Sequence, residues 1–172
     1  MITQFKIFEQ SSEVDLFDLD SVLKYINYDV NMTDSYGQNV LFKIIIDIKS
    51  SGDEQLAIDI FDYLIENGID VNCVDDGGET PLTMAYIYNR WLIFDFLLEN
   101  GADMKKNTYD ILMKASEIDT LNNIIKLLEF DIEWTPGFFE NLKSAEQEVI
   151  KEKFPEKYKE YIKNKRIKQF NI

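Results

Sequence analysis

The chain has 172 residues, of which 45% are hydrophobic and 13% aromatic, so it is long and apolar enough to form a sizeable core. Its net charge of −14 argues against a nucleic-acid-binding body and favours basic partners. It has no histidine and a single cysteine, which excludes an intrachain disulfide framework and a zinc site.

The charge is segregated along the chain. Residues 1–150 hold 29 acidic and 10 basic side chains (net −19), whereas residues 151–172 hold 3 acidic and 8 basic ones (net +5). The N-terminus has no basic start followed by an apolar run, and the densest apolar stretch, residues 44–46, is too short to span a bilayer. We therefore expect no membrane contact and a reducing, cytoplasmic setting.

The first predicted element is a degenerate helix pair within residues 1–33, with apolar side chains that include Leu16, Val22 and Ile26. Beyond it the chain repeats itself. Segment 34–44 is echoed by 75–85 at a spacing of 41 residues, and segment 61–72 by 94–105 at a spacing of 33. The surplus of eight residues predicts an insertion near 48–55.

The second copy carries the clearest local signals. Thr80 is expected to be a helix N-cap with Pro81 at the first helical position, and Gly101 is expected to end the following helix in the left-handed conformation. Each unit is therefore helix, short turn, helix and extended turn. The side chains expected to pack in the core of these helix pairs are Tyr63, Leu82, Ala85, Tyr86, Trp91, Phe94, Phe96, Leu97 and Leu98.

A third, shortened copy is predicted over residues 107–133, and a turn at 134–137 precedes a helix through Phe138, Phe139 and Leu142. Pro155 is expected to open a last helix, rich in lysine, that covers the final repeat. Its predicted apolar side holds Phe154, Tyr158, Tyr161, Ile162 and Ile167. The alternative interpretation of this basic helix is a patch for nucleic acid or anionic lipid.

The Thr-Pro-Leu…Ala run at 80–85 and the Gly-x-Asp-hydrophobic runs at 68–71 and 101–104 resemble the ankyrin repeat. The likeness is good for residues 34–106. Thr83 occupies the place of the family's usual histidine, and Tyr86 that of its second alanine.

This resemblance implies an all-α fold, an ankyrin-repeat helical solenoid of about three to four helix-turn-helix units with short β-turn fingers and helical caps. A single domain over residues 1–172 is expected. Its parts would be an N-terminal capping unit at 1–33, repeats at 34–74, 75–106 and 107–133, and a C-terminal helical cap at 134–172.

No motif for catalysis is present. Cys73 lies in a predicted extended turn without a histidine to activate it. The glycines at 77–78 lack the lysine partner of a phosphate loop, and the acidic cluster at 15–20 lacks the glycine and glutamate of a calcium loop. We therefore predict no enzyme, no cofactor, no metal ion and no small-molecule substrate.

In ankyrin-type units the turn tips and the exposed inner face of the first helix contact partners. By this resemblance the partner-binding residues are Ser35, Tyr36, Gln38, Asp47, Asp76, Gly77, Glu79, Ile87, Tyr88, Asn107, Tyr109, Glu117 and Ile118. Exposed tyrosine is a common binding anchor because it buries a large area with little loss of entropy.

The sequence thus predicts a non-catalytic protein–protein interaction module that binds a basic partner protein through an acidic concave surface. Acidic stand-alone ankyrin-like proteins resemble immunity proteins, which neutralise toxins by occluding them. The alternatives are a scaffold or effector adaptor that recruits a cellular protein and, less favoured, a carboxylate-dependent enzyme or a nucleic-acid binder acting through the basic C-terminal helix.

Overall fold

The computed structural model describes residues 15–104, 111, 112, 115, 121–130, 134 and 137–170. All regular secondary structure in these ranges is helical, which confirms the predicted all-α class. None of the helices described is long and apolar enough to cross a membrane. The chain divides into two compact units, unit 1 (residues 1–104) and unit 2 (residues 105–172). The expectation of a single domain over 1–172 stays a prediction.

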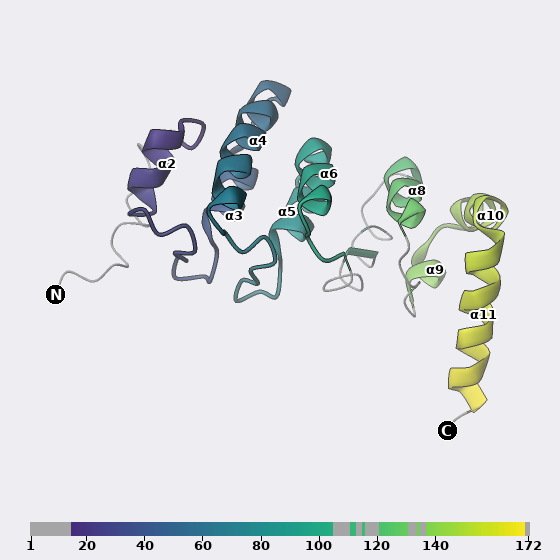
Figure 1. Cartoon of the computed structure of the whole chain (residues 1–172). Coiled ribbons are helices and arrows are strands. Elements are labelled where there is room, and N and C mark those ends of the chain that lie inside the picture. Colours follow the sequence, from purple (N-terminus) through teal and green to yellow (C-terminus); the bar gives the residue numbers. More distant parts are fainter. Residues whose placement is uncertain are drawn as a thin grey trace. The chain divides into compact units, whose positions relative to one another are not determined.

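Unit 1 contains five described helices: α2 (Leu19–Tyr25), α3 (Val40–Asp47), α4 (Ser51–Glu66), α5 (Pro81–Ile87) and α6 (Trp91–Glu99) (Figure 1). The helices α3 and α4 form one antiparallel pair, and α5 and α6 form the next. First helix packs on first helix and second on second, α3 against α5 and α4 against α6. This is the predicted helix-turn-helix repeat.

The local signals of the second repeat act as predicted. The Thr80 hydroxyl accepts a hydrogen bond from the Thr83 backbone N–H at 3.2 Å, and Pro81 is the first residue of α5. In the preceding repeat Asn39 caps α3 in the same way, accepting from the Leu41 N–H at 3.2 Å. Gly101 follows α6 with a φ of +88°, a conformation that glycine adopts without steric cost.

The eight surplus residues of the first repeat are helical. The turns at 48–50 and 88–90 have the same length, but α4 has 16 residues against 9 in α6, and α3 has 8 against 7 in α5. A reciprocal capping box starts α4 early, because the Ser50 hydroxyl accepts from the Asp53 N–H while the Asp53 carboxylate accepts from the Ser50 N–H. The insertion near 48–55 is thus about two extra turns of helix.

The core of unit 1 follows the helical period. On α4 the buried side chains are Ala57, Ile60, Phe61 and Leu64. Tyr63 is 36% exposed, so its predicted place in the core is wrong. The reason is angular, because Tyr63 lies about 200° around the helix from Phe61. Of the other predicted core positions, Leu82, Ala85, Tyr86, Phe94 and Leu97 are buried, and Trp91, Phe96 and Leu98 are half-buried.

Unit 2 contains α8 (Leu121–Glu129), α9 (Phe138–Asn141), α10 (Ser144–Lys153) and α11 (Pro155–Phe170). The last helix begins at the predicted proline. The sequence pattern predicts no separate helix at α10, whose residues are mostly polar and bury only Ile150.

An aromatic cluster fills the core of unit 2. The Trp134 ring is stacked on Phe139 with 5.8 Å between centroids, and both rings contact Tyr161 of α11. The Lys157 ammonium donates to the Leu128 carbonyl at 3.2 Å and also to the Phe130 carbonyl, so it caps the C-terminal end of α8. The predicted apolar side of α11 is only partly buried.

Ile167 is 48% exposed, contrary to its predicted place on the buried side of α11. It lies about 120° around the helix from the buried Tyr161, too far to share its face. Tyr158 and Ile162 are half-buried, and Phe154 belongs to the end of α10, where it is the C-cap residue.

Candidate partner-binding surface

A tight turn at residues 34–38, finger 1, leads into α3. The Asp34 carboxylate accepts hydrogen bonds from the backbone N–H groups of Tyr36 at 2.8 Å and Gln38 at 3.0 Å. The backbone N–H of Asp34 donates to the Gln38 carbonyl at 2.9 Å, which closes the turn. Such aspartate-centred turns form because the short carboxylate reaches the backbone two residues on.

Residues 75–79, finger 2, repeat this construction 41 residues later and lead into α5. The Asp75 carboxylate accepts from the N–H groups of Gly77 and Glu79, each at 2.9 Å, and the Asp75 N–H donates to the Glu79 carbonyl at 2.9 Å. The carboxylates of Asp34 and Asp75 therefore hold the backbone and serve the fold.

The two fingers lie side by side (Figure 1) and are hydrogen-bonded to each other. The Asp76 N–H donates to the Tyr36 carbonyl at 2.8 Å, and the Gln38 amide donates to the Asp75 carboxylate at 2.8 Å. The approach is close at Gly37, where a Cβ atom would lie 3.2 Å from the Asp76 carboxylate. These contacts make the finger pair a stiff, preorganised edge.

The two finger tips differ in what they present. Tyr36 is 67% exposed at the tip of finger 1, and the equivalent residue of finger 2 is Gly77, which has no side chain. Ser35 and Asp76 are the exposed residues that precede them. The pair of tips therefore offers one large aromatic ring next to a carboxylate.

The first helices of the two repeats expose matching stripes. Positions three and four residues apart share one helical face, and the partly or fully exposed residues of each helix obey that spacing. They are Lys43, Ile46 and Asp47 on α3, and Met84, Ile87 and Tyr88 on α5, each pair 41 residues apart. The ends of these helices are joined, because the Arg90 guanidinium donates to the Ile48 carbonyl.

The structure brings nine of the thirteen predicted site residues onto these elements. Ser35, Tyr36, Asp76 and Gly77 lie at the finger tips, Gln38 and Glu79 are half-buried at the finger bases, and Asp47, Ile87 and Tyr88 lie at the ends of α3 and α5. The other four, Asn107, Tyr109, Glu117 and Ile118, lie outside the described residues.

Two exposed apolar residues of this region are not among the predicted site residues. Ile46 is 38% exposed and Val74, just before finger 2, is 45% exposed. The 41-residue spacing would have revealed Ile46, since it is the counterpart of the predicted Ile87. For Val74 the sequence carries no comparable signal. We call Tyr36, Ile46, Asp47, Val74, Asp76, Glu79, Ile87 and Tyr88 together the finger surface.

The electrostatics of the chain favour cationic ligands at unit 1. Unit 1 carries 20 acidic and 5 basic residues (net −15), whereas unit 2 carries 12 acidic and 13 basic ones (net +1). In the part of the chain that the structure describes, no three Asp, Glu or Cys side chains gather as ligands for a metal ion. Exposed apolar groups among carboxylates suit burial against a protein partner.

Comparison with known families accounts for this architecture. A family model described as ankyrin repeats (three copies) matches residues 14–108 and again residues 50–135. No curated protein matches the chain. Ankyrin repeats generally mediate protein–protein interaction, and proteins built from them are typically non-catalytic interaction modules. With most of its length matched and the fingers and helix pairs recurring in register, the chain belongs to the ankyrin-repeat family.

Proposed function

We propose that unit 1 binds a basic protein partner through the finger surface. The observation that carries the proposal is the placement of exposed apolar side chains, with Tyr36 the most exposed, among carboxylates on two hydrogen-bonded fingers. The net charge of −15 on unit 1 supports a partner rich in lysine and arginine.

Tyr36 and Tyr88 act as the anchors in this proposal. A buried tyrosine removes about 150–250 Å² from water and loses little rotamer freedom, so its burial against a partner is favourable. The carboxylates of Asp47 and Asp76 pair with cationic side chains at the rim and speed encounter. Because the finger hydrogen bonds already fix the backbone, binding loses little conformational entropy.

Paired tyrosine variants test the surface. Immobilised full-length chain captures proteins from the cells that produce it, and each captured protein is then purified and its Kd measured. Replacing Tyr36 and Tyr88 by alanine is expected to raise the Kd at least about tenfold, as loss of binding hot spots does. The control replaces Tyr28 and Tyr63, which are exposed outside the finger surface, and is expected to leave the Kd within about twofold.

The charge of the partner provides the second criterion. The captured protein should be basic, and its association rate should fall steeply as salt is raised from about 50 to about 500 mM. An acidic partner, or equal losses in the finger-surface and control variants, would contradict the proposal.

A basic toxin is one partner class with the required chemistry, and its neutralisation would follow from steric occlusion. This immunity hypothesis is supported by the acidity of unit 1. It predicts that co-expression with such a toxin restores growth and that the double change Tyr36→Ala and Tyr88→Ala abolishes the rescue. Rescue that survives the double change would place the inhibitory surface elsewhere.

A further inference from the structure

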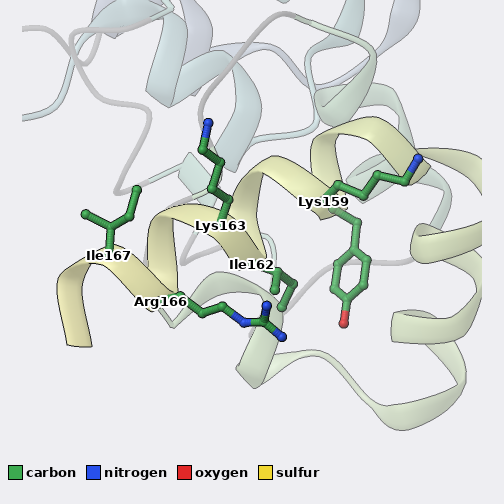
Figure 2. Close-up of a pocket in the computed structure, with 6 residues that line it drawn as sticks. Lys159, Ile162, Lys163, Arg166 and Ile167 are labelled. Carbon is green, nitrogen blue, oxygen red and sulfur yellow. The ribbon is translucent and has the colours of Figure 1, made fainter. Parts of the chain in front are cut away.

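The helix α11 has an outward face of which only one edge, at Tyr158, contacts the aromatic core: the Tyr158 ring centroid lies 5.1 Å from that of Phe139. Tyr161 and Lys157 point into unit 2, where they contact Trp134 and the end of α8. On the other side of the helix lies an open cavity of about 490 Å³, whose lining side chains are drawn in Figure 2. It is lined by Tyr158, Lys159, Ile162, Lys163, Arg166 and Ile167, which we call the α11 face.

The α11 face has an order set by the helical period. At about 100° per residue, the three cations Arg166, Lys159 and Lys163 fall in the middle of the face. Ile162 and Tyr158 flank them on one side and Ile167 flanks them on the other. In Figure 2 the Arg166 side chain extends back along the helix beside Ile162.

Two of these cations are available for a ligand. Within the described residues, neither the Lys163 ammonium nor the Arg166 guanidinium makes a hydrogen bond or ion pair, whereas the Lys159 ammonium pairs with Glu156 at 2.6 Å. The neighbouring cations of unit 2 are used internally: Lys151 by Glu148, Lys153 by Glu129, Lys157 by the end of α8 and Lys165 by Glu140. Positive charge is therefore left over at the C-terminal half of α11.

The arrangement disfavours two polyanionic ligands. A membrane-surface helix buries a central apolar stripe and keeps its cations at the edges, and the α11 face has the opposite order. Nucleic acid would place phosphates against the flanking Ile162 and Ile167, which offer a phosphate neither a charge nor a hydrogen bond. An acidic protein surface that also offers apolar side chains fits both features.

The chain itself carries such a surface. We propose that the α11 face of one molecule docks on the finger surface of a second copy, head to tail. This inference rests on the finger surface proposed above. Asp47 and Asp76 would meet the central cations, and Tyr36 and Ile46 would cover the apolar flanks. Two copies repel each other overall, but that repulsion is screened beyond about 8 Å at physiological salt. A head-to-tail approach also brings unit 1 of one copy, with a net charge of −15, against unit 2 of the other, with a net charge of +1.

The geometry of this contact has a consequence for binding. The two docking surfaces are different, so the association is heterologous and gives open chains or closed rings. A basic partner and the α11 face of another copy would compete for the finger surface. Self-association would then protect the exposed Tyr36 and Tyr88 until a tighter-binding partner displaces it.

Sedimentation velocity of the full-length chain tests the proposal between about 2 and about 200 µM, at about 150 mM and about 500 mM salt. The expected result is an average mass that rises above 20.2 kDa with concentration at low salt and falls at high salt. The double change Lys163→Glu and Arg166→Glu should weaken association at least about tenfold, and Ile167→Ser should weaken it too.

A control with the same change of charge reverses Lys143 and Lys153, two exposed lysines of unit 2 outside the α11 face. It should leave association within about twofold, since exposed ion pairs contribute little. All variants are compared at equal helicity by circular dichroism. The result that would overturn the proposal is a monomer at every concentration, or an association that the control weakens as much as the α11 variant.

Binding partners of other classes are outcomes of the same experiment. If the chain stays monomeric and an RNA oligonucleotide or a phosphatidylserine vesicle binds it in a way that Lys163→Glu and Arg166→Glu abolish, the second-copy proposal is wrong. Tyr36→Ala and Tyr88→Ala should weaken self-association as well as partner binding. If they weaken partner binding alone, this inference fails while the proposed function holds; if they weaken self-association alone, the proposed function fails.

Discussion

Asn72 reaches across one repeat to fix the backbone at Asp103. Its side-chain oxygen accepts from the Asp103 N–H at 2.8 Å while its amide donates to the Gly101 carbonyl at 3.0 Å. Asn31 makes the same pair of bonds one repeat earlier, to Asp70 at 2.7 Å and Gly68 at 2.9 Å. Consecutive repeats are thus joined by one asparagine each, and the residue in the corresponding place of the next repeat, Lys105, has no amide oxygen to continue the series.

Replacing Asn72 by alanine should lower the free energy of unfolding of unit 1 by about 1–3 kcal/mol, because two hydrogen bonds worth about 0.5–1.5 kcal/mol each are lost. Each unit contains one described tryptophan. In a Trp134→Phe background, the fluorescence of Trp91 during urea unfolding therefore reports on unit 1. Gln55→Ala, an exposed change on α4, is the control. Equal midpoints for the two variants would show that the asparagine bonds contribute nothing.

Alanine substitutions at Gly37 and Gly78 distinguish the cost of backbone strain from the cost of steric crowding between the fingers. Both have a positive φ, +75° and +83°, so alanine at either position should cost about 1–2 kcal/mol. A Cβ at Gly78 meets nothing within 4 Å, whereas one at Gly37 meets the Asp76 carboxylate at 3.2 Å and the Asp75 Cα at 3.4 Å. Gly37→Ala should therefore lower the urea midpoint more than Gly78→Ala. The reverse order would argue against close packing between the fingers.

The carboxylate of Glu140 should make unit 2 sensitive to acid. Partial burial alone would raise the pKa of Glu140, but the hydrogen bond from Lys165 and the positive charge of that lysine lower it to about 2 from the usual 4.5. Because the pKa is lower in the folded state, the stabilisation is present above about pH 5 and is lost as the pH falls towards 2.

The side chain of Glu140 is 41% exposed, so solvent screening reduces its contribution to on the order of 1 kcal/mol. Glu140→Gln should flatten the fall in stability between about pH 5 and pH 2, measured by Trp134 fluorescence in a Trp91→Phe background. Glu152→Gln, an exposed carboxylate of α10, should keep the steeper fall. A pH profile unchanged by Glu140→Gln would assign the acid sensitivity to other groups.

Ile46 should contribute to partner binding without contributing to the fold. Its side chain is 38% exposed, so Ile46→Ser is expected to change the free energy of unfolding by no more than about 0.5 kcal/mol. The Kd for a captured partner should rise about tenfold because an apolar contact is lost. Leu92→Ser changes a 51% exposed residue of α6 and should leave the Kd unchanged. Equal effects of the two changes would remove Ile46 from the surface.

The parts of the fold that the sequence predicted are those set by local backbone chemistry. Thr80, Pro81 and Gly101 each have a conformational reason for their place that does not depend on tertiary contacts. The fingers follow for the same reason, because Asp34 and Asp75 bond to their own turns. Local rules of this kind can be read from a single sequence.

The errors concern side chains whose burial depends on neighbours. Tyr63 and Ile167 are apolar residues at near-helical spacing, yet both lie outside the buried arc of their helices. The helix α10 escaped notice because a mostly polar segment gives no periodic signal, and Ile150 alone connects it to the core. In the candidate site, Tyr36 and Tyr88 could be predicted because they occupy repeat positions that contact partners in ankyrin-type units, whereas Val74 lies between such positions.

The side chains of Asn31 and Asn72 form joints between repeats, because each makes two hydrogen bonds to main-chain atoms of the following repeat. A joint of that kind does not depend on the side chains of the residues it holds, except at Gly68 and Gly101, whose φ values of +84° and +88° favour glycine. Thr83 and Tyr86, which replace customary residues of the family, are held by the core instead: the Thr83 hydroxyl lies 3.1 Å from that of Thr80, and the Tyr86 ring packs edge-on against Trp91. The repeated joint suggests how the array could be lengthened. A duplicated block of residues 73–105 should form the asparagine bonds with the repeats before and after it if its last residue is changed from lysine to asparagine.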